Sequence, residues 1–392
     1  MQNKIYFSSS KGDLSFAGRL LWKAKTLALE DKEKVRCLLF AKTHTLGAKH
    51  VPAQDQIRLL GRIERELMKY QGVVEKIEHH LLPYRYGGVG EKFLGLMTGP
   101  GQLDMLKSIL KQAILSPDTK ALYQTLYRAQ GDFIPLLKQA VRRGIPATVF
   151  VECQARGDEE KNRFIAQELA KAGVKVLTQC PFKVHAKLLL IEGKTPFVHI
   201  GTGNYHEAHG RSFLEASFCT QDEHVAQDGR ALFHFLETGA IPRWHKLAVA
   251  PFNLKSKVLG LIATETQKAR QGAPCLIQGQ VNALTDPDVI DALYQASKAG
   301  VPVQLKVRGA CGLIPHPNIT VHIPVGRYLA HRRLFRFGIG PGQRLFLSSA
   351  DWTTEKLTRR VEVLVEVVSK GLVVPVGVIP TATIPPPKAV RP

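Results

Sequence analysis

Hydrophobic residues recur at helical spacing through the first part of the chain. Between residues 56 and 82 they follow an i, i+3 pattern, at Ile57, Leu60, Ile63 and Leu67, and such spacing places them on one face of an α-helix. Pro83 ends this pattern, because proline cannot continue a helix. We therefore expect residues 1–96 to form a small helical N-terminal domain.

From residue 97 onwards, short apolar runs that resemble strands alternate with amphipathic segments. The runs ALYQTLYR, PATVFVEC and VKVLTQ are separated by helical patterns, and a second such series starts near Pro274. Alternating strands and helices are typical of an α/β layer with parallel strands. We predict two α/β halves, residues 97–244 and 245–370, and a Pro-rich tail, 371–392, that we expect to be disordered.

The two predicted halves repeat the same ordered features. A helix that ends in glycine turns through a proline into an apolar strand, in RRGIPATVFV and again in KAGVPVQLKV. A histidine and a basic residue two positions later then precede another apolar strand, in VHAKLLLI and AHRRLFRF. A turn of small residues follows, GTGNY in one half and SSADW in the other. Features repeated in the same order favour an internal duplication.

Each repeat carries a candidate unit for handling phosphate. Strand alternation places His185 and Lys187 on one face, and His331 and Arg333 repeat this spacing. A histidine can act at neutral pH as a nucleophile or a general acid, and a neighbouring cation can hold phosphate oxygens. The turn that contains Asn204 offers backbone N–H groups to an anion. We predict that both histidines act on one phosphorus, through a phosphohistidine intermediate.

Three arginines at or near strand ends are candidates for neutralising a transferred phosphoryl group, namely Arg128, Arg156 and Arg308. For Arg156, which precedes a helical segment, an ion pair at the helix terminus is the alternative interpretation. The other histidines are interpreted as structural or solvated. The chain has no P-loop and no HExxH motif, and GIGPG at 338–342 is interpreted as a hairpin turn.

The charge balance favours an anionic partner. Lys and Arg number 54 against 33 Asp and Glu, a net charge of +21. Such an excess destabilises a compact chain through self-repulsion unless an anion relieves it, and a solvated basic surface is the alternative.

The cysteines and the apolar segments bear on location. The six cysteines form no C-x-x-C pair, and we expect reduced thiols in the core. The N-terminus lacks the apolar segment of a signal peptide, and no apolar run is long enough to span a bilayer. We expect a cytoplasmic protein.

The ordered motifs resemble the polyphosphate kinase family of the phosphohistidine type, whose catalytic halves have a phospholipase D-like α/β fold. Similar stretches include VFVECQARGDEEKN, KVHAKLLLI, HIGTGNY, QLKVRGACGLIP and SSADWTTEKLTRRVEV, and they cover most of residues 102–368. The segment 1–96 is also similar, through LSFAGRLLWKA and LLGRIERELMKY.

The resemblance implies an enzyme that transfers the terminal phosphate of ATP reversibly to inorganic polyphosphate, with Mg²⁺. It implies that His185 is phosphorylated, that Arg308 and His331 contact the phosphates of ATP, and that Phe213 lies in the nucleotide site. From the repeat we also place Lys187 beside the catalytic histidine, and Asn204 and Arg333 in the nucleotide site. Arg128 and Arg156 match arginines associated with the magnesium site. A guanidinium has no lone pair for a cation, so this association would run through phosphate.

The implied partners are ATP, ADP and polyphosphate, with no specific nucleic acid. Peripheral membrane association and a homo-oligomer stay open.

The chain departs from the family pattern at several positions. Phe213 matches a tyrosine that contacts ATP and keeps the ring without the hydroxyl, and Glu215 matches an aspartate. Ala330 stands where the family has a glutamate, and His44 where it has an asparagine. No segment matches the family's middle domain. These departures affect nucleotide affinity and assembly more than phosphohistidine chemistry.

Two other functions stay open. The altered ATP contacts fit a degenerate, inactive homologue that binds polyphosphate or nucleotide. The two histidines and the basic charge fit a phospholipase D-like phosphodiesterase, but neither half has the H-x-K-x₄-D pattern, since position 192 is Glu and position 338 is Gly.

Overall fold

The structure is a computed structural model, and it describes residues 95–98, 102–206, 213–314, 316–323 and 329–368. The chain divides into two compact units, Met1–Phe93 and Leu94–Pro392. The expected helical domain and the expected disordered tail therefore lie outside the described residues, except for Gly95 and Leu96, which begin a strand.

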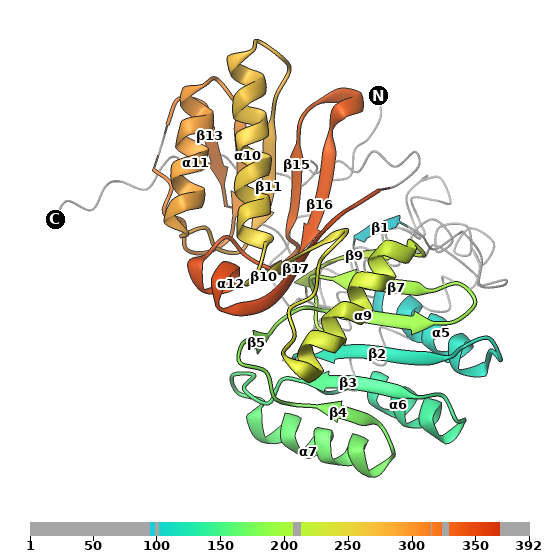
Figure 1. Ribbon diagram of the computed structural model, residues 1–392. Coiled ribbons are helices and arrows are strands. Elements are labelled where there is room, and N and C mark those ends of the chain that lie inside the picture. The colour runs from blue at the N-terminus through green and yellow to red at the C-terminus, as the bar shows by residue number, and fades with distance from the viewer. Residues whose placement is uncertain (1–94, 99–101, 207–212, 315, 324–328, 369–392) are drawn as a thin grey trace, which may run out of the picture. The chain divides into compact units, whose positions relative to one another are not determined.

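The first half forms a seven-stranded mixed sheet in the order β1-β9-β7-β6-β2-β3-β4 (Figure 1). Its strands are β1 (Gly95–Thr98), β2 (Ala121–Leu126), β3 (Ala147–Val151), β4 (Lys175–Leu177), β6 (Leu188–Glu192), β7 (Phe197–Gly201) and β9 (Ala216–Thr220). Its helices are α5 (Gln102–Leu115), α6 (Phe133–Arg142), α7 (Glu159–Lys171) and α9 (Glu223–Thr238). Strands β2, β3 and β4 are parallel, and the other neighbours are antiparallel.

The second half repeats this topology. Its sheet has the order β10-β17-β16-β15-β11-β12-β13, formed by β10 (Leu247–Ala250), β11 (Ile277–Val281), β12 (Val303–Val307), β13 (Ile319–His322), β15 (Leu334–Phe337), β16 (Arg344–Ser348) and β17 (Arg360–Glu366). Its helices are α10 (Leu254–Arg270), α11 (Pro287–Lys298) and α12 (Thr354–Thr358). The matching strand orders confirm the predicted class, two α/β halves related by duplication.

Local signals repeat as well. Asp286 caps α11 by accepting the Val289 N–H at 3.1 Å, and Pro287 occupies the first turn, where proline is favoured. The Asp286 carboxylate also binds Lys255 of α10 at 2.8 Å. In the first half Lys107 of α5 binds Asp132, before α6, at the same distance. Each pair ties the first helix of its half to the start of the second.

Two short parallel pairings cross between the halves. Strand β5 (Lys183–Val184) pairs with the start of β17, and β14 (Leu329–Ala330) pairs with β8 (Phe213–Leu214). Each candidate histidine follows one of these pairings directly. The predicted His-x-basic pairs therefore lie in short connections before β6 and β15 rather than within strands. The loop 338–342 joins the antiparallel strands β15 and β16, as the hairpin interpretation predicts.

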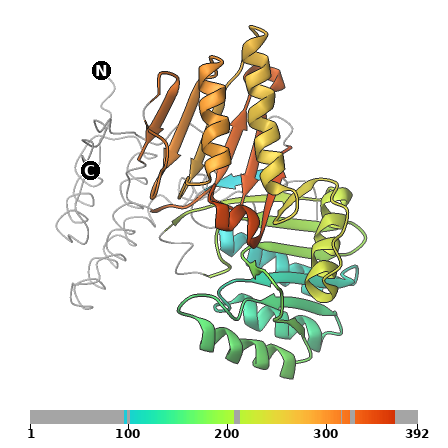
Figure 2. The same ribbon diagram turned by 60° about the vertical axis from the view of Figure 1, so that its left-hand side comes forward.

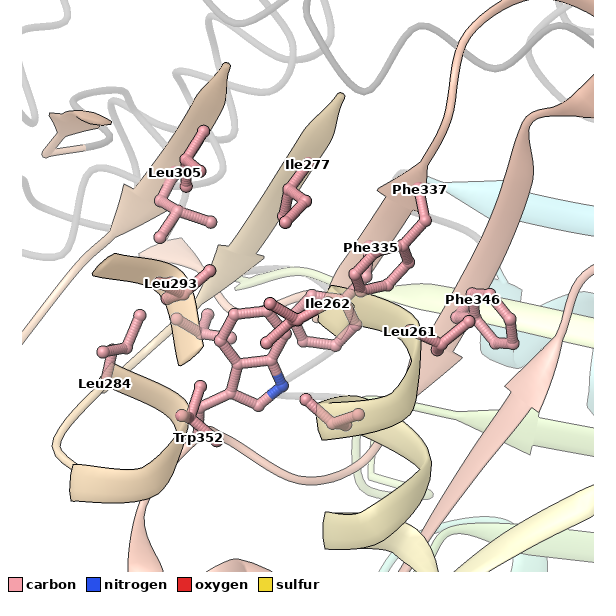
Figure 3. Close-up of a cluster of buried hydrophobic side chains, with 14 of the residues drawn as sticks. Leu261, Ile262, Ile277, Leu284, Leu293, Leu305, Phe335, Phe337, Phe346 and Trp352 are labelled. Atoms are coloured by element: carbon pink, nitrogen blue, oxygen red, sulfur yellow. The ribbon is translucent and has the colours of Figure 1, made fainter. Parts of the chain in front are cut away.

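Two apolar clusters hold the layers together. One lies between α10, α11 and the second sheet, where Phe335 and Trp352 stack with ring centroids 4.5 Å apart and planes at 8° (Figure 3). The other combines residues of both halves, including Phe233 of α9, Leu334 of β15 and Val363 of β17. The turned view also shows the helices of each half lying against their own sheet (Figure 2). The second cluster makes the halves one hydrophobic unit.

The cysteines fit the expectation of core thiols only in part. Cys219 and Cys275 are buried and free, but Cys311 is exposed, because it lies in the loop after β12. That expectation was wrong for Cys311. None of the helices that the structure describes is both long and apolar enough to cross a membrane.

Removal of the stacked indole should loosen the second half. We expect Trp352→Ala to lower the free energy of unfolding by about 3–5 kcal/mol, because it leaves a cavity against Phe335. Chemical denaturation followed by circular dichroism measures this. Trp352→Phe, which keeps an aromatic ring there, should cost clearly less, and equal losses in both variants would contradict the importance of the stack.

Candidate active site

His185 is held by the opposite half of the molecule. The backbone N–H groups of His185 and Ala186 both donate to the Val361 carbonyl of β17 at 2.9 Å. The His185 Nδ1 lies 3.0 Å from Oε2 and 2.9 Å from Oε1 of Glu362, which is also in β17 and fully buried. A first-half histidine is thus oriented by a second-half carboxylate.

His331 is held in the reciprocal way. Its backbone N–H donates to the Leu214 carbonyl at 3.0 Å, and its Nδ1 lies 2.8 Å from Oε1 of Glu215. The Phe213 ring meets the His331 ring edge-on, with centroids 5.5 Å apart. The two halves therefore exchange carboxylates, and the Nε2 of His331 lies 3.4 Å from the NH2 of Arg333.

The two turns of small residues that follow β7 and β16 form hydrogen bonds to these glutamates. Thr202 donates to Glu215 Oε2 at 2.6 Å, and Ser349 donates to Glu362 Oε2 at 2.5 Å. A Cβ at Gly203 would lie 2.7 Å from the Glu215 Cγ, so this position has no room for a side chain. The backbone N–H groups of Thr202 and Ser349 donate to neighbouring strands, so these two are not free to bind an anion.

The basic residues two positions after each histidine are buried. The Lys187 Nζ donates to the His185 carbonyl at 2.6 Å and lies 5.2 Å from the centroid of Tyr127. Arg333 donates through Nε to Asp351 at 2.8 Å and through NH1 to the His331 carbonyl at 3.2 Å. The second cation thus has a carboxylate partner. For Lys187, burial lowers the pKa well below its ordinary value.

The electrostatics favour neutral histidines. Burial lowers the pKa of both His185 and His331, with Arg333 and Lys187 adding repulsion. Burial raises the pKa of Glu362 to about 7. For Glu215, burial opposes ionisation, but hydrogen bonds from His331 and Thr202 hold the pKa below its ordinary value. A neutral histidine that donates Nδ1–H to a carboxylate presents the Nε2 lone pair as a nucleophile.

The predicted arginines lie at different depths. Arg128 forms an ion pair with Asp158, and its NH2 donates to the Arg156 carbonyl at 3.5 Å. Arg156 is exposed. Arg308 is half-buried, and Arg333, Asp351 and Glu215 all influence its pKa, which burial lowers. Arg308 therefore belongs to the cluster around His331.

Asn162 fixes the loop that carries Arg128. Its Oδ1 accepts the Ala129 N–H at 3.0 Å, and its Nδ2 donates to the carbonyls of Tyr127 and Glu152, each at 2.8 Å. The Tyr127 ring contacts the His185 ring with centroids 4.8 Å apart. The Glu152 carboxylate accepts the Val184 N–H at 2.6 Å. This network positions the segment that leads to His185.

Sequence reasoning missed Glu362, Tyr127, Glu152 and Asn162. A signal existed for Glu362 alone, because Glu215 follows Gly201 by 14 residues and Glu362 follows Ser348 by 14. Glu152 and Asn162 lie in the stretch VFVECQARGDEEKN, but the stretch does not show their backbone contacts, and nothing in the residue pattern shows the ring contact of Tyr127. Asn204 lies half-buried in the first turn, where its carbonyl accepts the His206 N–H at 2.8 Å.

Other histidines fit structural roles. Both ring nitrogens of His199 are bonded, to the Tyr205 hydroxyl at 2.8 Å and the Ser217 hydroxyl at 2.9 Å, and burial lowers its pKa to about 3.

Among the described residues, no group of three or more His, Cys, Asp or Glu side chains could hold a metal ion. The guanidinium groups of Arg128 and Arg156 do not fit as direct metal ligands either.

Comparisons with known proteins match the described unit. The family model for polyphosphate kinase C-terminal domain 1 matches residues 96–242, and that for C-terminal domain 2 matches residues 247–379. A polyphosphate kinase of Pseudomonas syringae pv. tomato is 40% identical over 279 residues, which are 68% of this chain and 38% of that protein.

Longer and structural matches agree. The polyphosphate kinase of Erythrobacter litoralis is 32% identical over 376 residues, 88% of this chain and 53% of that protein. The crystal structure of polyphosphate kinase from Porphyromonas gingivalis matches with a TM-score of 0.64 and 29% identity, covering 74% of this chain and 49% of that one. The chain thus spans about two fifths to half of the length of these relatives. By family models, sequence and structure, it belongs to the polyphosphate kinase family.

Proposed function

We propose that this chain is a polyphosphate kinase that transfers the terminal phosphate of ATP reversibly to inorganic polyphosphate through a phosphohistidine on His185. The observation that carries the proposal is the pair of histidines, each bonded through Nδ1 to a buried glutamate of the opposite half. Relatives named polyphosphate kinase support the same activity. The proposed catalytic halves are residues 97–244 and 245–370.

The first step transfers the γ-phosphoryl group of ATP to His185. The His185 Nε2 attacks the γ-phosphorus, an N–P bond forms, and the bond to the β,γ-bridging oxygen breaks, so that ADP leaves. Glu362 accepts the Nδ1–H and stabilises the positive charge that develops on the ring. In the second step a terminal oxygen of polyphosphate attacks the phosphorus and the N–P bond breaks. His331 serves the leaving or incoming oxygen.

The remaining site residues neutralise and orient phosphates. Arg308 and Arg333 lie in the cluster around His331. Arg128 follows Tyr127, whose ring contacts His185, and Arg128 donates to the Arg156 carbonyl. Guanidinium groups suit this role because they present several donors to phosphate oxygens. Phe213 offers a ring edge at His331, and we place Asn204 in the same nucleotide site. We propose that Mg²⁺ arrives bound to ATP as part of the substrate, in a cytoplasmic reaction.

A degenerate polyphosphate-binding homologue is the alternative, and Phe213 favours it, because its ring lacks a hydroxyl with which to bind nucleotide. Labelling separates the two functions, since a binder forms no covalent phosphate.

The nucleophile can be tested directly. With Mg²⁺ and ATP labelled at the γ-phosphate, we expect acid-labile, base-stable label on the protein, and His185→Ala should reduce it to background, because the variant lacks the attacking nitrogen. His234→Ala removes an exposed histidine of α9 and should keep the label. Equal labelling of the His185→Ala variant would refute the assignment, and no label on a folded wild-type chain would favour the alternative.

The role of Glu362 predicts a pH dependence. Its carboxyl must be ionised to accept the Nδ1–H, and its pKa is about 7, so the rate of phosphohistidine formation should rise with pH through about 7. At about pH 6 the rate should be roughly tenfold below its plateau. The neutral amide introduced by Glu362→Gln would accept the same N–H through its carbonyl at every pH, so this variant should lack the pH-dependent limb in rapid-quench measurements.

Glu215→Gln is the matched control. The pKa of Glu215 lies below its ordinary value, so this variant should slow the reaction and still show the limb near pH 7. A limb that persists in Glu362→Gln would mean that another group titrates.

A further inference from the structure

One face of the second sheet contributes Leu334 and Leu347 to the apolar cluster that joins the halves, and we call it the inner face. It also carries buried polar groups without hydrogen-bond partners. Gln280 of β11 is 4% exposed, and its Nε2 donates to no acceptor in the described part of the chain. The register places Gln280 directly beside Lys306 of β12, and the Lys306 Nζ is likewise buried without a hydrogen bond to any described residue. The Nε of Arg332, next to His331, is another such donor. Buried donors without partners are costly.

Within the described ranges, no carboxylate forms an ion pair with either of these two cations. The pKa of Lys306 is lowered by burial and by the charge of Arg332, and burial lowers the pKa of Arg332 itself. Two half-buried cations that repel each other destabilise the fold unless an anion lies between them. An anion that accepts from Gln280, Lys306 and Arg332 would satisfy all three groups.

Comparison with the first half shows that this cluster is not required by the fold. The last pair of the β2–β3 ladder is Leu126–Val151, and the last pair of the β11–β12 ladder is Val281–Val307. When these pairs are superimposed, Lys306 corresponds to Phe150, because each lies one residue before the end of its strand. The His-x-basic repeat likewise aligns Arg332 with Ala186. Phe150 and Ala186 are buried in the apolar cluster that joins the halves. The same sheet positions therefore hold apolar core in one half and cations in the other.

The cluster adjoins the proposed transfer site. Arg308 follows Lys306 by two residues, which places the two about 7 Å apart along the chain, and Arg308 interacts electrostatically with Arg333 and Glu215. Arg332 lies between His331 and Arg333 in sequence. Lys306 therefore lies two residues along the chain from a cation of the cluster around His331.

The chemistry of the face favours a phosphate chain over a nucleotide base. Beyond Lys306 the same face presents Gln304, Gln278 and Arg336, and these side chains bond to one another. The inner positions of β11, β12 and β15 carry amides, cations and Leu334 and no Phe, Tyr or Trp ring, and the neighbour of Lys306 in β13 is His322, whose imidazole can also donate to phosphate. A row of donors without carboxylates matches a linear polyanion.

We propose that Lys306, Arg332 and Gln280 form a phosphate subsite that binds the polyphosphate chain next to the transfer site. This inference rests on the proposed function for the identity of the chain, but its test uses binding alone. If the wild-type chain formed no phosphohistidine, that result would count against the proposed function, and the binding measurement could still be interpreted.

The test is equilibrium binding of sodium polyphosphate of one defined chain length, at fixed ionic strength, by the full chain. Lys306→Gln/Arg332→Gln should raise the Kd by at least about tenfold, because two charge-assisted hydrogen bonds are lost. Arg270→Ala/Lys298→Ala removes the same charge from the exposed ends of α10 and α11 and should change the Kd less than about twofold.

A second variant guards against misfolding. Lys306→Phe/Arg332→Ala installs the residues of the first half and should show the same loss, with a thermal unfolding transition retained. A Kd within about twofold of wild type in both variants would overturn the subsite. A loss confined to ATP binding, with polyphosphate affinity intact, would overturn the choice of occupant.

Discussion

A carboxylate taken out of water is costly unless hydrogen bonds and cations compensate it. Glu215 and Glu362 both lie inside this molecule, and each obtains its compensation from the two halves together: a hydroxyl from its own half and a histidine from the other. Neither half alone can satisfy its glutamate, and neither can orient its histidine. The apolar cluster shared by the halves and the crossed pairings β5–β17 and β8–β14 keep these four side chains in reach. The active site therefore forms only when the two halves pack against each other.

Duplication makes the surroundings of the two histidines nearly symmetric, and small differences make them chemically distinct. Arg333 is neutralised by Asp351, whereas Lys187 binds a backbone carbonyl and a tyrosine face. Glu215 is held in its ionised form, whereas Glu362 titrates near neutrality. A symmetric pair of histidines would offer two equivalent nucleophiles. The asymmetry of their partners lets one histidine attack while the other serves an oxygen.

Periodicity predicted the fold well because the main strands are long enough to show it. The repeated strands, the glycine-proline entry into β3 and β12, and the hairpin at 338–342 all follow local rules. Strands β5, β8 and β14 have two residues each, too few to show any alternation, yet they bring the halves together. Asn162 also escaped detection, because a buried amide that binds three backbone groups looks in sequence like any polar helical residue. The histidines could be found only because the repeat singled them out.

The inner faces of the two sheets need not stay alike after duplication. Where the halves meet, Leu334 and Val363 pack into the shared core, and a charge there would be buried without an anion. Gln280 of β11 and Lys306 of β12 lie one and two strands further along the sheet, and neither is part of that apolar cluster. In the first half, Phe150 and Ala186 occupy the positions of Lys306 and Arg332, and both are buried in the shared core. One copy of the duplicated sheet therefore places cations, beside a site that both copies build, at positions that the other copy fills with apolar core.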